Sequence, residues 1–128
     1  MFEGHMERVR ELLAGHSTIT LATVHEGRSW AAAVFYASDA NLNLYFVTDL
    51  KTRHGRDLHH DARVSGAVNH DVSSWGEVIG LQIEGRAVVL EGEARLKALD
   101  TYLAKFPEVQ RLFDKPRGIS ERVIAERL

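Results

Sequence analysis

The stretch that decides the fold is residues 43–60, NLYFVTDLKTRHGRDLHH. The apolar run from Leu42 to Thr48 favours a β-strand, which stops at Asp49. The polar segment Lys51 to His54 predicts the first turn of a short helix that runs through Leu58. A helix N-terminus, free backbone N–H groups, a hydroxyl group and an arginine side chain meet there. Such a combination is typical of an anion site, and a phosphate group is the natural anion.

Simpler interpretations of these residues stay open. Charged turns usually face solvent, so Arg53 would then only pair with Asp49 or Asp57 at the surface. The nearby histidines do not predict a metal centre, because adjacent residues on a helix point in different directions. No cysteine or carboxylate set completes a tetrahedral shell, and single solvated side chains are expected for His54, His59 and His60.

Hydrophobic patterns on both sides of this stretch predict an antiparallel β-structure. Ile19, Leu21 and Val24 alternate with threonines, and Glu26-Gly27 is a hairpin-turn signal. The predicted strands are residues 17–25, 28–38, 42–48, 63–69 and 78–93, the last with a bend at Gly85, and the predicted helices are residues 3–14, 51–58 and 94–105. Residues 118–128 fit a strand or a helix. Consecutive hairpins favour a mainly β fold with flanking helices, an antiparallel barrel that forms one domain over residues 1–128.

The composition is that of an ordinary globular protein. Apolar residues make up 45% and charged residues 27% of the 128 residues. The net charge of −2 provides no basic field for nucleic acid, and the apolar runs are far shorter than the roughly 20 residues of a membrane span. No cysteine occurs, so disulfides and thiol catalysis are excluded. We expect a cytoplasmic protein without nucleic-acid or membrane partners.

A phosphate site beside a strand of small residues suits flavin mononucleotide (FMN). Its phosphate tail takes an arginine and backbone donors, and its flat ring needs a strand whose backbone it can approach closely. Ala31-Ala32-Ala33 offers such a strand, although small residues under a packed helix would give the same pattern. Trp75 either lies near the ring, anchors a dimer interface or packs its own loop, whereas Trp30 is expected to be structural.

From Ser17 to Gly92 the chain resembles the FMN-binding split-barrel family that includes pyridoxamine 5′-phosphate oxidase. The residues Tyr45-Phe46-Val47-Thr48, followed by Arg53-His54, are similar to the family's strand that ends in an aromatic residue, Thr and Asn and is followed by Ser-Arg-Lys. Asp61-Ala62-Arg63-Val64 is similar to the family's Asn-Pro-Arg-Val. Together with Gly80-Leu81-Gln82-Ile83-Glu84-Gly85, the Thr-Arg-His triplet resembles most an uncharacterised branch related to the oxidase.

The resemblance implies an antiparallel split β-barrel and a homodimer with two FMN sites at its interface. The triplet at residues 52–54 matches the phosphate-binding Ser-Arg-Lys, and the strand end at residues 47–48 matches the contact with the ring and the ribityl chain. Residues 32–34 match the strand along the flavin ring, and residues 75 and 82 fall where the second protomer reaches the cofactor. The expected cofactor-binding residues are Ala32, Ala33, Val34, Val47, Thr48, Lys51, Thr52, Arg53, His54, Trp75 and Gln82.

The chain departs from the oxidase at the positions that recognise its substrate. The oxidase carries an arginine near Ala32, a phosphate contact that is missing here, and a substrate lysine near Ala37. Its C-terminal Arg-x-His segment has no counterpart here. We therefore expect a flavin-dependent oxidoreductase that acts on an unknown small substrate rather than on vitamin B6. The alternatives are the same barrel with a deazaflavin, a barrel that binds haem or flavin without turnover, and a dimeric module without cofactor. In the haem alternative, the axial ligand would be His54, His59 or His60.

Overall fold

The computed structural model of the chain describes residues 2–77, 80–111 and 122–126. Within these residues the strands form two four-stranded antiparallel sheets rather than one closed ring. The first sheet has the order β2 (Arg28–Phe35), β1 (Thr18–His25), β5 (Arg63–Asn69) and β6 (Gly80–Arg86), and the second has the order β3 (Ala37–Ser38), β4 (Leu44–Asp49), β8 (Arg122–Glu126) and β7 (Val88–Val89).

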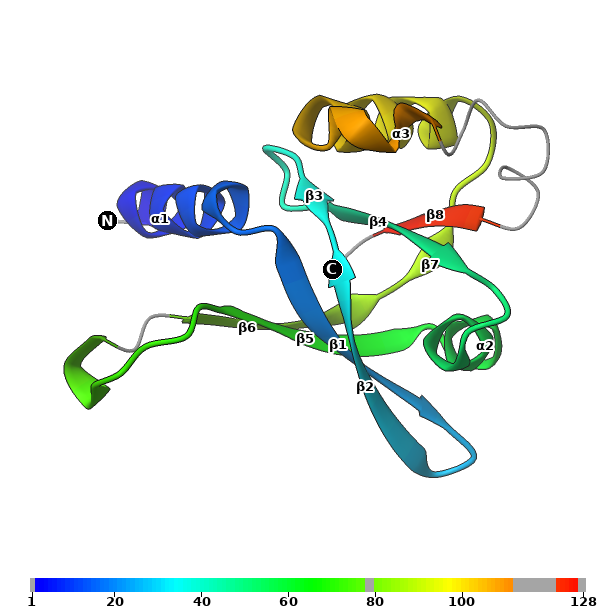
Figure 1. Cartoon of the computed structure of the whole chain (residues 1–128), viewed down its shortest axis with the longest axis horizontal. Coiled ribbons are helices and arrows are strands. Elements are labelled where there is room, and N and C mark those ends of the chain that lie inside the picture. The colour runs from blue at the N-terminus through cyan, green and yellow to red at the C-terminus, as the bar shows by residue number, and fades with distance from the viewer. Residues whose placement is uncertain (1, 78–79, 112–121, 127–128) are drawn as a thin grey trace.

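Three α-helices flank these sheets within the described residues. They are α1 (Phe2–Gly15), α2 (Arg53–His60) and α3 (Gly92–Lys105), and the short 3-10 helices η1 (Trp75–Glu77) and η2 (Pro107–Val109) lie in loops. Figure 1 shows α3 over the second sheet and α2 at one end of the molecule, where it packs on β1 and β2. The predicted mainly β fold with flanking helices, of the split-barrel type, is confirmed.

The predicted single strand over residues 28–38 is wrong, because the chain leaves the first sheet at Tyr36. The Tyr36 N–H donates to the carbonyl oxygen of Ser17, and its hydroxyl donates to the carbonyl oxygen of Leu13 at 2.6 Å. The ring is completely buried, and Ala37 after it is buried as well. Two consecutive buried residues break the alternation of a strand with one solvent face. The chain therefore continues as β3 in the second sheet.

The predicted long strand over residues 78–93 is also wrong, because here too the chain passes from the first sheet to the second. The break does not fall at Gly85. Gly85 stays in β6, opposite Val64 of β5. The chain changes sheets at Ala87, which is buried and whose N–H donates to the Ala62 carbonyl oxygen at 2.8 Å. After the short β7, helix α3 begins at Gly92, which has a positive φ of 61°. Residues 78 and 79 lie outside the described residues.

Smaller differences from the predicted boundaries have local causes. Thr52 is the N-cap residue of α2, so this helix begins at Arg53 and not at Lys51. β4 begins at Leu44 and not at Leu42, because Leu42 has a φ of 66°. In the undecided C-terminal segment, residues 122–126 form β8 between β4 and β7.

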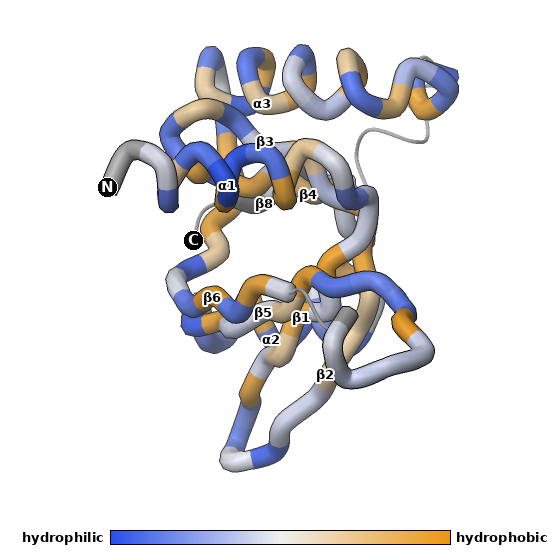
Figure 2. Tube along the Cα trace, turned by 90° about the vertical axis from the view of Figure 1, so that its left-hand side faces the viewer, coloured by the Kyte–Doolittle hydropathy of each residue, from blue (hydrophilic) through white to orange (hydrophobic). Residues whose placement is uncertain are grey.

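The main core lies between α1 and the two sheets. Its buried side chains are Leu13, Ile19, Leu21, Tyr36, Leu44, Phe46, Val64, Val68 and Ala87. A smaller cluster of Ala37, Tyr102 and Phe106 joins α3 to β3. Figure 2 shows hydrophobic residues alternating with hydrophilic ones along α3, as expected for a helix with one buried face. None of the helices in the described residues has both the length and the apolar character that a membrane span requires.

Candidate functional site at the start of helix α2

Hydrogen bonds centred on Thr52 close the turn between β4 and α2. The Thr52 backbone N–H and its hydroxyl both donate to the Asp49 carbonyl oxygen, at 3.1 and 2.7 Å. The Thr52 hydroxyl oxygen accepts from the Gly55 N–H at 3.1 Å and so caps the helix. Lys51 is exposed on the same turn, and its N–H donates to the Asp49 carboxylate at 2.8 Å. The Thr52 hydroxyl is therefore engaged in the fold itself.

His54 is turned toward β4. Its Nε2 lies 2.6 Å from Oγ1 of Thr48 and 3.4 Å from Oγ1 of Thr52. Burial lowers the pKa of His54 below its ordinary value of 6.5, and the Asp57 carboxylate opposes this shift only in part. The imidazole is therefore neutral at neutral pH. It ties the start of α2 to β4 instead of adding positive charge there.

The Arg53 side chain leaves its hydrogen-bond donors unused within the described residues. It is half-buried and lies over the ring of Trp30, with Cζ 4.1 Å from the ring centroid. Within the described part of the chain its guanidinium group forms no hydrogen bond or ion pair. A guanidinium group carries five N–H donors in a fork that matches a phosphate group. Stacking therefore holds Arg53 in place and leaves its N–H donors available to a ligand.

The backbone of α2 adds further donors at the same end. The Gly55 N–H is taken by the Thr52 side chain and the Arg56 N–H by the Thr52 carbonyl oxygen. The N–H groups of Arg53 and His54, the first two of the helix, have no acceptor among the described residues. The first turn itself contains no acidic residue that would offset the positive end of the helix dipole. The start of α2 is therefore suited to a compact anion.

Alternation along two strands separates residues that are neighbours in the sequence. Ala32 and Val34 lie opposite buried residues of β1, whereas Ala33 lies opposite the exposed Thr20 and faces the other side of the sheet. Thr48 is buried on the His54 side of β4, while the half-buried Val47 packs against the cluster under α3. β2 is an edge strand of the first sheet, so one side of its backbone pairs with no strand in the described structure.

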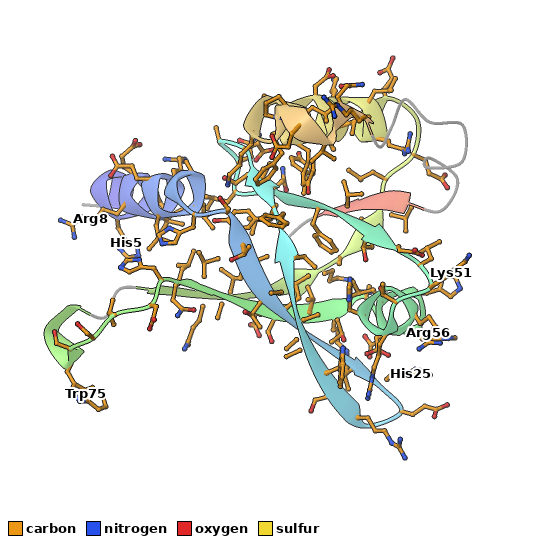
Figure 3. The ribbon with its side chains drawn as sticks, viewed as in Figure 1. His5, Arg8, His25, Lys51, Arg56 and Trp75 are labelled. Atoms are coloured by element: carbon orange, nitrogen blue, oxygen red, sulfur yellow. The ribbon has the colours of Figure 1, made fainter. Side chains whose placement is uncertain are left out.

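Trp75 and Gln82 lie away from the start of α2 in a single chain. Trp75 is 96% exposed, and Figure 3 shows it at the opposite end of the molecule from Arg56. Gln82 is exposed on the outer face of the first sheet, where it lines a shallow cavity of about 540 Å³ with Thr20 and Ala67. The predicted residues that the fold brings together are Thr48, Lys51, Thr52, Arg53 and His54.

Sequence reasoning missed the contacts that two residues make beside the site. Trp30 was expected to be structural, but it lies under the Arg53 guanidinium group. The signal was its position two residues before Ala32 on one strand, which puts both on the same face. Asp57 is buried and accepts from the Thr23 hydroxyl at 2.8 Å, so it fastens α2 to β1. Among the described residues, no three His, Asp or Glu side chains are grouped so as to hold a metal ion.

Comparison with known proteins identifies similar sequences and folds. A family model described as pyridoxamine 5′-phosphate oxidase matches residues 6–127. The chain is 38% identical over 105 residues to the UPF0306 protein YhbP of Salmonella paratyphi B, and the match covers 81% of this chain and 71% of that protein.

Two solved structures show the same fold. A haem-binding protein of Mycobacterium smegmatis is 24% identical with a TM-score of 0.78, over 94% of this chain and 49% of that one. HutZ, the haem storage protein of Vibrio cholerae, is 17% identical with a TM-score of 0.79, over 93% of this chain and 85% of that one. The chain thus spans about half the length of the mycobacterial protein.

Proposed function

Because this chain belongs to the pyridoxamine 5′-phosphate oxidase family, as its sequence motifs predicted, we propose that it binds FMN. We propose further that it is an oxidoreductase acting on a small molecule that is not a vitamin B6 compound. The observation that carries the proposal is the half-buried Arg53, held over Trp30 with unused donors at the start of α2. A partly buried guanidinium group has lost some of its hydrogen bonds to water. Bidentate hydrogen bonds to a phosphate group would replace them.

The start of α2 fits the phosphate end of FMN. Arg53 would supply charge and paired donors, and the unused N–H groups of Arg53 and His54 would supply further hydrogen bonds. Thr52 would act through its cap, which fixes the direction of these N–H groups. His54 would hold the start of the helix against Thr48. This role differs from that of the charged lysine at the matching position of the family's Ser-Arg-Lys motif.

The ring of FMN would lie along β2 and be completed by a second copy of the chain. The edge position of β2 and the small side chains of residues 31–33 support close approach of a flat ring. Trp75 and Gln82 lie on faces that Arg53 of the same chain does not share, and they are free to meet another copy. We therefore favour a homodimer with the cofactor at its interface, and a cytoplasmic location that suits a chain without cysteine.

When bound, FMN would supply the hydride or electron transfer, and the chain would position it and shield it from water. The substrate differs from that of the oxidase because the cations that recognise it are missing. Ala37 stands where the oxidase has its substrate lysine, and here it is only 1% exposed in the cluster under α3. Ala32 offers no charge either. A substrate that presents a phosphate group to these two positions would find no cation.

The proposal is tested by retention of FMN. Wild type, Arg53→Ala and Arg8→Ala are each mixed with FMN and desalted, and the visible absorbance spectrum is recorded. Arg8 is exposed on α1, remote from α2 in Figure 3, so its loss is a matched change in charge. Wild type and Arg8→Ala should keep the flavin spectrum, whereas Arg53→Ala should lose about 1.5–3 kcal/mol of binding free energy. A wild type that retains no flavin rejects the cofactor, and equal retention by Arg53→Ala rejects the site.

Haem binding without flavin turnover is a second candidate, because two proteins of the same fold are named as haem proteins. His59 and His60 are exposed at the end of α2, whereas His54 is engaged with Thr48. An axial ligand would therefore come from His59 or His60. A Soret band that appears on haem addition and disappears in His59→Ala or His60→Ala would favour this candidate. The absorbance of the bound cofactor also distinguishes FMN from a deazaflavin.

A further inference from the structure

A cationic cavity lies on the flank of α2, where the helix faces the end of the β1–β2 hairpin. Its volume is about 510 Å³, and we call it the hairpin cavity. Its lining includes His25, Arg28, Arg53, Arg56, Asp57 and His60. Thr48, Thr52 and His54 do not line it, so Arg53 alone is shared with the proposed cofactor site. Figure 3 shows His25 and Arg56 at the same end of the molecule.

Positive charge exceeds negative charge in the lining of the hairpin cavity, where three arginines stand against Asp57 and Glu26. Arg28, Arg53 and Arg56 form no ion pair in the described part of the chain. The Asp57 carboxylate is buried and accepts from Thr23 on the sheet. The remaining acid, Glu26, is exposed and lies 3.7 Å from Nε2 of His25. Guanidinium donors from two separate elements therefore face one space without partners.

Two stacked histidine rings form part of the cavity wall. The rings of His25 and His60 have centroids 4.3 Å apart and planes 16° apart. The charged or titratable groups around this pair are Glu26, Arg28, Arg53, Arg56, Asp57 and His59. The pair adds ring nitrogens to a lining that already holds three guanidinium groups.

We propose that the hairpin cavity is a second anion site, which takes the phosphate or similar dianionic group of a small molecule other than the bound cofactor. Arg28 donates from β2 and Arg56 from α2, beside the stacked rings of His25 and His60. The volume lies within the usual range of small-molecule sites, about 300–1,000 Å³. The group would belong to a phosphorylated substrate or to a phosphate-bearing nicotinamide reductant. The inference stands on the cavity alone and does not require that FMN binds.

The test is calorimetric titration with sulfate, which is a dianion at neutral pH. Arg28→Gln and Arg56→Gln should each weaken sulfate binding by about fivefold, the upper range for an exposed charge pair. Arg8→Gln should not change the affinity, and Glu26→Gln should raise it.

Competition experiments identify the source of the group and separate this site from the cofactor site. Displacement of sulfate by glycerol 3-phosphate supports a phosphorylated substrate, and displacement by NADPH alone supports a reductant. Equal sulfate affinity in wild type, Arg28→Gln and Arg56→Gln overturns the proposal. If saturation with FMN abolishes the effects of Arg28→Gln and Arg56→Gln on sulfate binding, the proposal is also overturned, because the cavity would then hold the cofactor phosphate. If FMN does not bind at all, the sulfate results still decide the second site.

Discussion

Replacing Gly55 by alanine should distort the turn that forms the start of α2. A Cβ at this position would lie 2.4 Å from the Asp49 carbonyl oxygen, 3.0 Å from Oγ1 of Thr52 and 3.1 Å from Cα of Leu50. Two of these three atoms belong to the backbone and cannot rotate away, so the turn itself must move. The same Asp49 carbonyl oxygen accepts from the Thr52 hydroxyl, so a shift of the turn also weakens the helix cap.

The size of the effect follows from opposing terms. Alanine is favoured over glycine inside a helix by about 1 kcal/mol, which acts in favour of the variant. Extra atoms in a closely packed site cost about 1–3 kcal/mol, and weakening a threonine cap costs about 1 kcal/mol more. We therefore expect Gly55→Ala to lower the free energy of unfolding by about 1–3 kcal/mol.

Urea unfolding followed by circular dichroism measures this loss. Gly4→Ala is the control, because a Cβ at Gly4 in α1 would have no neighbour within 4 Å. That variant should be as stable as wild type or slightly more stable. A Gly55→Ala protein as stable as wild type would show that the turn at Asp49 and Leu50 leaves room for a Cβ at position 55, which contradicts the packing described here.

Three further predictions concern the residues that hold the site and the helices. Thr23→Val should lower the free energy of unfolding by about 1–3 kcal/mol, because it removes the hydroxyl that donates to the buried Asp57 carboxylate at 2.8 Å. Thr20→Val is the control: Thr20 is exposed on β1, so this variant should change the stability little in the same urea assay. Lys105→Met should lower the free energy of unfolding by about 1 kcal/mol, because the Lys105 ammonium group donates to the carbonyl oxygens of Leu13 and His16 at the end of α1. An unchanged urea midpoint would contradict this prediction. The lowered pKa of His54 means that the folded chain binds fewer protons than the unfolded chain, so its contribution is complete above pH 6.5 and is lost as the pH falls through the folded value. His54→Gln should therefore show a smaller loss of stability than wild type between pH 7.5 and 5, and parallel pH profiles would argue against a buried neutral imidazole.

Local signals in the sequence were sufficient for most of the elements. The strand predicted over residues 63–69 coincides with β5, because its residues alternate and polar turns bound it. The Glu26-Gly27 signal was correct because both residues adopt a positive φ, of 51° and 74°, as a tight hairpin turn requires.

The changes of sheet at Tyr36 and Ala87 were not predictable from such signals. A strand that crosses from one sheet to the next keeps its β-forming composition. The break is set by contacts that are distant in the sequence, such as the Tyr36 hydroxyl on the carbonyl oxygen of Leu13. Gly85 was the more obvious breaker in the sequence, yet it pairs regularly with Val64.

In the candidate site, too, contacts within one turn were predictable from the sequence, whereas contacts between elements were not. Thr52, Arg53 and His54 are neighbours on one turn, so the sequence alone brings them together. The stacking of Arg53 on Trp30 joins α2 to β2, and the Asp57 contact with Thr23 joins α2 to β1, so both depend on how the helix packs on the sheet. The placement of Trp75 relative to the cofactor stays a prediction, because it depends on a second copy of the chain.

The most direct measurement compares FMN with riboflavin, which has the same ring and no phosphate group. Each flavin is titrated with wild type and with Arg53→Ala, and binding is followed by quenching of the flavin fluorescence. A phosphate site at Arg53 predicts that wild type prefers FMN by roughly tenfold or more, and that Arg53→Ala loses this preference while its riboflavin affinity is unchanged. Equal affinity of wild type for FMN and riboflavin, or an equal loss for both flavins in Arg53→Ala, would contradict a phosphate site at the start of α2.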